Sequence, residues 1–181
     1  MAFTLADLNE AIAAAITEPQ AILTATRRLT RGEFASRSRR LAHLLADSGL
    51  GCHRERDALA PWESGQDHVA LYLYNGHEYL EAMIGVAKAR AVPCNVNYRY
   101  VEDELVYLLD NAGADAIMYH ARFAPTLAEA LRKMDGGIGE LLPRIREQQP
   151  PRFLAVLVSP LMHAGVGFAA SRPGWLHRAG G

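Results

Sequence analysis

The amino-acid sequence predicts an α/β fold in which a mostly parallel sheet is flanked by helices. Short apolar, β-branched runs alternate with segments of helical periodicity between residues 69 and 134, and the connections between them are short. In addition, 50% of the 181 residues are hydrophobic, which is enough to form a substantial core. Because parallel strands need crossover connections, this β-α-β alternation predicts helices packed against the sheet through right-handed crossovers.

Two helices are predicted before the alternating region. The first begins after Thr4, which can cap it, and ends before Pro19. Its large apolar side chains recur at helical spacing, at Leu5, Leu8, Ile12 and Ile16. The second begins after Thr30, where Glu33 three residues later completes a capping box, and it stops at Gly49. One side of this second helix carries Phe34, Leu41, Leu44 and Leu45, and the other largely carries Arg37, Arg39 and Arg40.

The later elements follow from the same patterns. A polar stretch over 51–67 predicts a long surface loop. The alternating region then predicts strand 69–74, helix 78–90, strand 92–96, helix 101–111, strand 116–119 and helix 125–134. The chain is thereby predicted to divide into an α/β unit over 1–134, a glycine- and proline-rich linker over 135–152, a detached strand segment over 153–170 and a disordered tail over 171–181.

Composition excludes several classes of protein. A net charge of −1 provides no field that would attract nucleic acid, and no apolar run approaches the roughly 20 residues that span a membrane. The N-terminus lacks the basic stretch of a secretory signal, so a cytoplasmic protein is expected. Cys52 and Cys94 lie far apart and the seven histidines show no metal-ligand spacing. Free thiols and no metal site are therefore predicted.

Gly136-Gly137-Ile138-Gly139 is the one stretch with the glycine content of a phosphate-binding loop. Such a loop connects a strand to the N-terminus of a helix and usually includes a lysine, serine or threonine. Here a predicted helix precedes the glycines and no strand does. We therefore interpret this stretch as linker.

The segment 95–100 follows a predicted strand and precedes a helix, at the edge where open α/β sheets bind their ligands. Its polar groups could bind a ligand, or Asn97 could shape the turn while Tyr98 and Tyr100 pack against neighbouring elements; we favour the second interpretation. The acidic residues 102–104 suit the first turn of the next helix and are interpreted as stabilising rather than catalytic.

Three stretches occur in a characteristic order: FTLADLNEAIAAAI, LTRGEFASRSRRLAHLLADSGL and DHVALYLYNGHEYLEAMIGVAKARAVPCNVNYRYVEDELVYLLDNAGADAIMYHARFAPTL. Together, over residues 3–131, they resemble the AMP-forming acyl-CoA synthetases of the adenylate-forming superfamily, in particular the actinobacterial fatty-acid or steroid side-chain type. The resemblance implies a partial N-terminal domain of the adenylate-forming fold. It also implies the family reaction, in which a fatty acid or other carboxylate, ATP and coenzyme A, with magnesium, give acyl-CoA, AMP and pyrophosphate.

The sequence departs from this family at the phosphate loop. The family's Thr/Ser/Gly-rich segment ending in Pro-Lys-Gly is expected between about Met134 and Phe153 and is not found, nor are the later adenine-binding, ribose-binding and hinge motifs. The two lysines, Lys88 and Lys133, lie on predicted helices, and neither can be assigned as the family's adenylation lysine. No catalytic, cofactor-binding or metal-binding residue is therefore predicted, and no cofactor is expected for this chain.

The stretch PRFLAVLVSPLMHAGVGFAA resembles the family segment that follows the phosphate loop, in which PLMH lines the acyl and pantetheine side of the pocket. By this resemblance, Met162 and His163 are the candidate substrate-binding residues.

These observations lead to a functional prediction and two alternatives. The first is a truncated acyl-CoA synthetase that is inactive alone because it lacks the ATP loop. The second is a non-catalytic partner that binds or regulates a full-length synthetase, with dimerisation left open. The third is a small enzyme of unknown chemistry, for which no constellation of residues was found.

Overall fold

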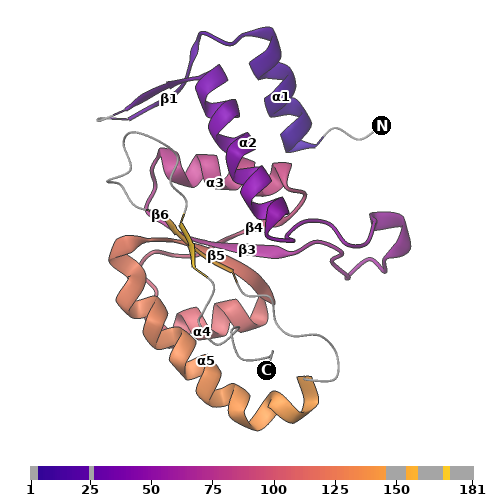
Figure 1. The fold of residues 1–181 in the computed structure, drawn as a ribbon, viewed down its shortest axis with the longest axis vertical. Coiled ribbons are helices and arrows are strands. Elements are labelled where there is room, and N and C mark those ends of the chain that lie inside the picture. Colours follow the sequence, from indigo (N-terminus) through magenta and orange to yellow (C-terminus); the bar gives the residue numbers. More distant parts are fainter. Residues whose placement is uncertain (1–3, 25–26, 146–153, 159–168, 172–181) are drawn as a thin grey trace, which may run out of the picture.

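In a computed structural model of the chain, the described residues are 4–24, 27–145, 154–158 and 169–171, and the side chains are described as far as Met134. The elements follow in this order (Figure 1): α1 (Leu5–Ala15), β1 (Gln20–Leu23), β2 (Arg28–Thr30), α2 (Arg31–Asp47), η1 (Arg56–Ala58), β3 (His68–Tyr72), α3 (His77–Lys88), β4 (Val92–Asn95), α4 (Glu102–Asn111), β5 (Ala114–His120), η2 (Ala121–Phe123), α5 (Ala124–Ile145), β6 (Leu154–Val158) and β7 (Ala169–Ser171).

The main sheet has the strand order β4-β3-β5-β6-β7. β4, β3, β5 and β6 are parallel to their neighbours, and β7 pairs antiparallel with β6. β1 and β2 form a separate antiparallel pair. The predicted mostly parallel α/β sheet is confirmed.

Helices cover both faces of this sheet. α1, α2 and α3 lie on one side, and α4 and α5 lie on the other (Figure 1). β3 serves both layers: Val69 and Leu71 pack in the cluster with α2 and α3, whereas Ala70 and Tyr72 pack in the cluster with α4 and α5. All four of these residues are buried, as expected for an interior strand of a parallel sheet.

Both predicted N-terminal caps are formed. Thr30 Oγ1 accepts a hydrogen bond from the Glu33 amide at 3.2 Å, and Glu33 Oε2 accepts one from the Thr30 amide at 2.8 Å. Thr4 and Asp7 make the equivalent pair of bonds at 3.1 and 3.0 Å. These bonds satisfy amides that have no partner within their helix, which fixes where α1 and α2 begin.

The structure corrects two predictions in the C-terminal part. Residues 135–145, predicted as linker, belong to α5, which runs to Ile145. The strand predicted as detached is β6, the parallel neighbour of β5. Both differences have one cause: a parallel β5–β6 pair needs a crossover that returns the chain along the sheet, and α5 is that crossover. The division of the chain into four units stays a prediction, and 146–153, 159–168 and 172–181 lie outside the described residues.

Charged contacts join the three helices of the first layer. Arg37 of α2 donates from Nε and Nη2 to the two carboxylate oxygens of Glu81 on α3, at 2.6 and 2.9 Å. Lys88 Nζ of α3 lies 2.5 Å from Glu10 Oε1 on α1, and it donates to Ser38 Oγ of α2 at 2.9 Å. These contacts hold the helices in fixed positions on one another.

None of the helices in the described part of the chain combines the length and the apolar character needed to cross a membrane.

Candidate functional site

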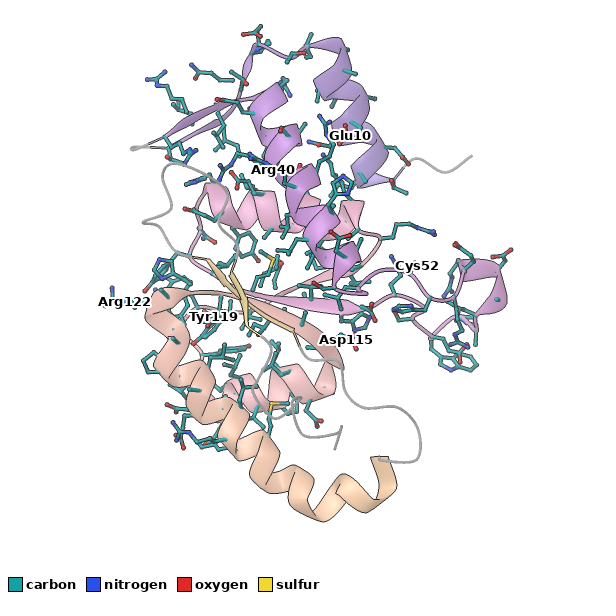
Figure 2. All side chains as sticks on the ribbon, viewed as in Figure 1. Glu10, Arg40, Cys52, Asp115, Tyr119 and Arg122 are labelled. Atoms are coloured by element: carbon teal, nitrogen blue, oxygen red, sulfur yellow. The ribbon has the colours of Figure 1, made fainter. Side chains whose placement is uncertain are left out.

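The carboxyl ends of β3, β4 and β5 meet at one edge of the sheet, because these strands are parallel. The chain leaves this edge at residues 73–76, 96–101 and 121–123. The structure thus confirms the predicted position of the segment that follows β4. In doubly wound sheets, ligands bind outside this edge. Asp115, at the start of β5, lies at the opposite end of the strand from Tyr119 and Arg122 (Figure 2).

Aromatic side chains from all three strand ends gather at this edge. The Tyr74 ring centre lies 5.3 Å from that of Tyr98, 5.1 Å from that of His120 and 4.7 Å from that of Phe123. Tyr72 stacks on Phe123 at 4.5 Å. We call these five residues the aromatic cluster. Rings at these separations attract one another beyond their burial, so the cluster fixes the three strand ends relative to each other.

The hydrogen bonding of His120 determines where its ring proton lies. The Arg122 amide donates to His120 Nδ1 at 3.1 Å, so Nδ1 acts as an acceptor and carries no proton. The same bond caps the short helix η2, at the turn from β5 into α5.

Asn97 shapes the turn after β4, as the sequence predicts. Its Oδ1 accepts from the Arg99 amide at 3.0 Å, and its backbone carbonyl accepts from the Tyr100 amide at 3.0 Å. Tyr98 packs on Tyr74, and Tyr100 packs against the cluster of core residues beside α4. The interpretation of these tyrosines as packing residues is confirmed.

The acidic residues that follow also have structural roles. Glu104 Oε2 accepts from the Val101 amide at 3.0 Å, at the start of α4. Asp103 Oδ1 lies 2.7 Å from Lys133 Nζ on α5. These contacts join α4 to α5 and occupy the N-terminus of α4, where the helix dipole favours negative charge.

Tyr72 supports the edge through its hydroxyl, which donates to the Tyr100 carbonyl oxygen at 2.8 Å. Burial of the ring raises the pKa of Tyr72, so the hydroxyl remains a donor at neutral pH. This bond connects the end of β3 to the start of α4.

Tyr72→Phe is expected to lower the stability of the chain by about 1 kcal/mol, because the Tyr100 carbonyl loses its donor. Chemical denaturation followed by circular dichroism measures the change. Tyr107→Phe, at an exposed position on α4, is the matched control and should leave stability unchanged. Equal losses in the two variants would contradict a role for the hydrogen bond.

Both lysines form ion pairs with carboxylates. Lys88 is in the last turn of α3, near the amino ends of the strands, and its side chain is 6% exposed. Burial lowers the pKa of Lys88, while the bond to Glu10 opposes this effect. The bond with Asp103 raises the pKa of Lys133. Both ammonium groups are thus engaged in ion pairs within the helical layers.

The predicted substrate-binding residues Met162 and His163 lie outside the described residues, and their role stays a prediction. Among the described residues, no group of three or more His, Cys, Asp or Glu is placed to hold a metal ion. Sequence reasoning did not identify the aromatic cluster. The available signal was an aromatic or imidazole residue at the end of a predicted strand, Tyr74 as the last residue of 69–74 and His120 directly after 116–119.

Comparison with known proteins places this fold in a family. The model of the family described as AMP-binding enzyme matches residues 10–151. The chain is 48% identical over 145 residues to the medium-chain acyl-CoA ligase Mig of Mycobacterium avium, covering 80% of this chain and 25% of that protein. It is 37% identical over 131 residues to a 3-oxocholest-4-en-26-oate–CoA ligase of Rhodococcus rhodochrous, covering 72% of this chain and 21% of that protein.

A solved structure agrees at the level of the fold. A benzoate CoA ligase from Burkholderia xenovorans superimposes with a TM-score of 0.66 at 19% identity, covering 88% of this chain and 27% of that one. The chain thus spans about a quarter of the length of the relatives it matches. The family match shows that the chain belongs to the AMP-binding enzyme family, and the two sequence relatives are acyl-CoA ligases.

Proposed function

We propose that this chain forms the N-terminal α/β unit of an acyl-CoA ligase for fatty acids, and that the 181-residue polypeptide alone does not form an acyl-adenylate. The ligase reaction uses ATP, magnesium and coenzyme A in the family that the chain resembles. The fatty-acid class is supported by the 48% identity to a medium-chain acyl-CoA ligase.

The proposal that the chain alone does not form an acyl-adenylate rests on the ion pairs of its two lysines. Adenylation develops negative charge on the phosphates of ATP, and an enzyme stabilises that charge with fixed donors and cations. Lys88 and Lys133 are the only lysines in the sequence, and each forms an ion pair with a carboxylate, Glu10 and Asp103 respectively. The sequence also contains no Thr/Ser/Gly-rich segment ending in Pro-Lys-Gly.

The cations nearest the carboxyl edge are arginines on its rim. Arg99 lies over the Tyr98 ring, 5.5 Å from its centre, and Arg122 is exposed beside the start of α5. The rings of the aromatic cluster pack on one another. The carboxyl edge, in the described residues, therefore has the strand ends that border a ligand site but no phosphate-binding loop.

ATP–pyrophosphate exchange tests this proposal. The purified chain is incubated with ATP, magnesium, labelled pyrophosphate and octanoate, and the exchange is expected to equal the rate without protein. The M. avium medium-chain ligase, assayed in parallel, is the positive control. Carboxylate-dependent exchange above background by the isolated chain would contradict the proposal.

We also propose that Met162 and His163 line the acyl side of the pocket, a role supported by the resemblance of the PLMH stretch alone. Irradiation of the chain with a diazirine-bearing medium-chain fatty acid, followed by peptide mass spectrometry, should place the label on the peptide that contains these two residues. Labelling confined to other peptides would show that they do not contact the acyl chain.

A further inference from the structure

A serine and a histidine meet where the segment 51–67 enters β3. Ser64 Oγ lies 3.0 Å from His68 Nε2, within hydrogen-bond distance. The other ring nitrogen, His68 Nδ1, lies 2.6 Å from the backbone carbonyl oxygen of Ala112. A hydroxyl beside an imidazole whose second nitrogen is held by an acceptor is the arrangement of a serine nucleophile and its general base. We call Ser64 and His68 the dyad.

The Ala112 contact determines which ring nitrogen can take up a proton. A carbonyl oxygen only accepts hydrogen bonds, so Nδ1 carries a proton and donates to it. In a neutral ring, Nε2 is then the acceptor, and it faces the Ser64 hydroxyl. The His68 backbone is held as well, because its amide donates to Asp115 Oδ2 at 2.9 Å. Figure 2 labels Asp115 at the opposite end of β5 from Tyr119, so the dyad lies at the amino end of the sheet.

The hydroxyl of Ser64 also contacts the backbone of Gln66. The Gln66 carbonyl oxygen lies 3.1 Å from Ser64 Oγ and is a second acceptor for its hydrogen bond, but a carbonyl cannot take up the proton. Of the two acceptors, only His68 can therefore act as a base. The Gln66 amide donates to Ser64 Oγ at 3.3 Å. A donor to this oxygen stabilises the negative charge that develops on it when the proton leaves.

Ser64 is open to a ligand. Its residue is exposed, and it lines a cavity of about 770 Å³ between the segment 51–67, the start of α1 and the end of α3. The wall includes apolar side chains, such as Leu59 and Ala91, and the cationic Arg54. The Arg54 amide donates to the Gly65 carbonyl at 3.1 Å, so the Arg54 side chain begins opposite the residue that follows Ser64. The cavity thus offers apolar surface and a cation beside the hydroxyl.

We propose that the dyad is a nucleophilic site that cleaves small carboxylic esters. Ser64 Oγ attacks the carbonyl carbon of the ester while its proton passes to His68 Nε2, and Arg54 stabilises the charge on the carbonyl oxygen. The ester C–O bond breaks, and the alcohol leaves with the proton from His68. Water, which gives a proton to His68, then attacks the acyl-serine and releases the carboxylic acid. This reaction needs neither ATP nor coenzyme A, so the inference goes beyond the proposed function and does not depend on it.

A fluorophosphonate probe tests the proposal, because an activated serine oxygen displaces fluoride from its phosphorus. The purified 181-residue chain is expected to be labelled on the peptide that contains Ser64, and to hydrolyse p-nitrophenyl butyrate faster than Ser64→Ala does. His68→Asn should slow the labelling at least about 100-fold, because asparagine keeps an N–H donor for the Ala112 carbonyl but has no base at the position of Nε2. Ser36→Ala, at an exposed position of α2, is the matched control and should leave the labelling of Ser64 unchanged.

Three results would overturn the proposal. The first is a folded wild-type chain that is not labelled at Ser64, which would show that the dyad only holds the segment 51–67 in place. The second is equal labelling of wild type and His68→Asn, with circular dichroism showing that both are folded. The third is equal labelling of Ser64 in native and in urea-unfolded wild type, a comparison that decides the question even if His68→Asn does not fold.

Discussion

Glu81→Ala is expected to destabilise the folded chain by about 3 kcal/mol, because it leaves the Arg37 guanidinium without its partner between α2 and α3. The Arg37 and Glu81 side chains are only 15% and 3% exposed, and two hydrogen bonds join them. The pair is therefore shielded from the solvent screening that makes surface ion pairs weak. For a chain of this length, the loss corresponds to a fall in melting temperature of roughly 6–12 °C.

Urea denaturation of purified wild type and variant measures this effect. The control is the double variant Arg37→Met/Glu81→Leu, which removes both charges and keeps apolar volume; it should recover most of the lost stability. Arg39→Met, which affects an exposed ion pair with Glu10, should change stability by less than about 1 kcal/mol. A loss below about 1 kcal/mol for Glu81→Ala would show that the ion pair is not energetically shielded.

The α-helices up to α5 and the strands β3, β4 and β5 could be predicted from the sequence because local patterns determine them, whereas the β1–β2 pair was not predicted. The alternation of apolar runs and helical periodicity gave the parallel sheet, and the Thr30–Glu33 spacing located the start of α2. Caps and turns depend on residues two to four positions apart, as at Asn97 and Arg99. Such short-range chemistry can be read directly from a sequence.

Contacts between distant residues explain what the sequence could not show. Arg37 was interpreted as part of the polar side of α2, but its carboxylate partner is 44 residues away on α3. The aromatic cluster likewise joins residues at the ends of three different strands. The pattern on α1 indicated a helix correctly, but it could not indicate that Ala13 rather than Leu8 would be buried, because Glu10 decides the orientation through ion pairs to α2 and α3.

The second large effect is expected where α2 and α3 come closest. A Cβ atom added at Gly85 would lie 2.6 Å from Leu41 Cδ2, 2.8 Å from Cγ and 3.0 Å from Cβ. Leu41 is fully buried, so its side chain cannot move out of the way into solvent. The absence of a side chain at this position of α3 thus allows the close approach of the two helices.

Gly85→Ala is therefore expected to lower stability by about 2 kcal/mol, a net effect in which overpacking outweighs the gain in helix propensity on replacing glycine. Urea denaturation gives the size of the loss. Gly85→Ala in a Leu41→Ala background is the informative control, because it removes Leu41 Cγ and Cδ2, the two atoms closest to the new methyl group, and leaves only Cβ at 3.0 Å. There the substitution should be neutral or stabilising. If Gly85→Ala instead stabilises the wild-type chain, α2 can shift away from α3 at little cost, and the ion pairs that join these helices would not hold them at a fixed distance.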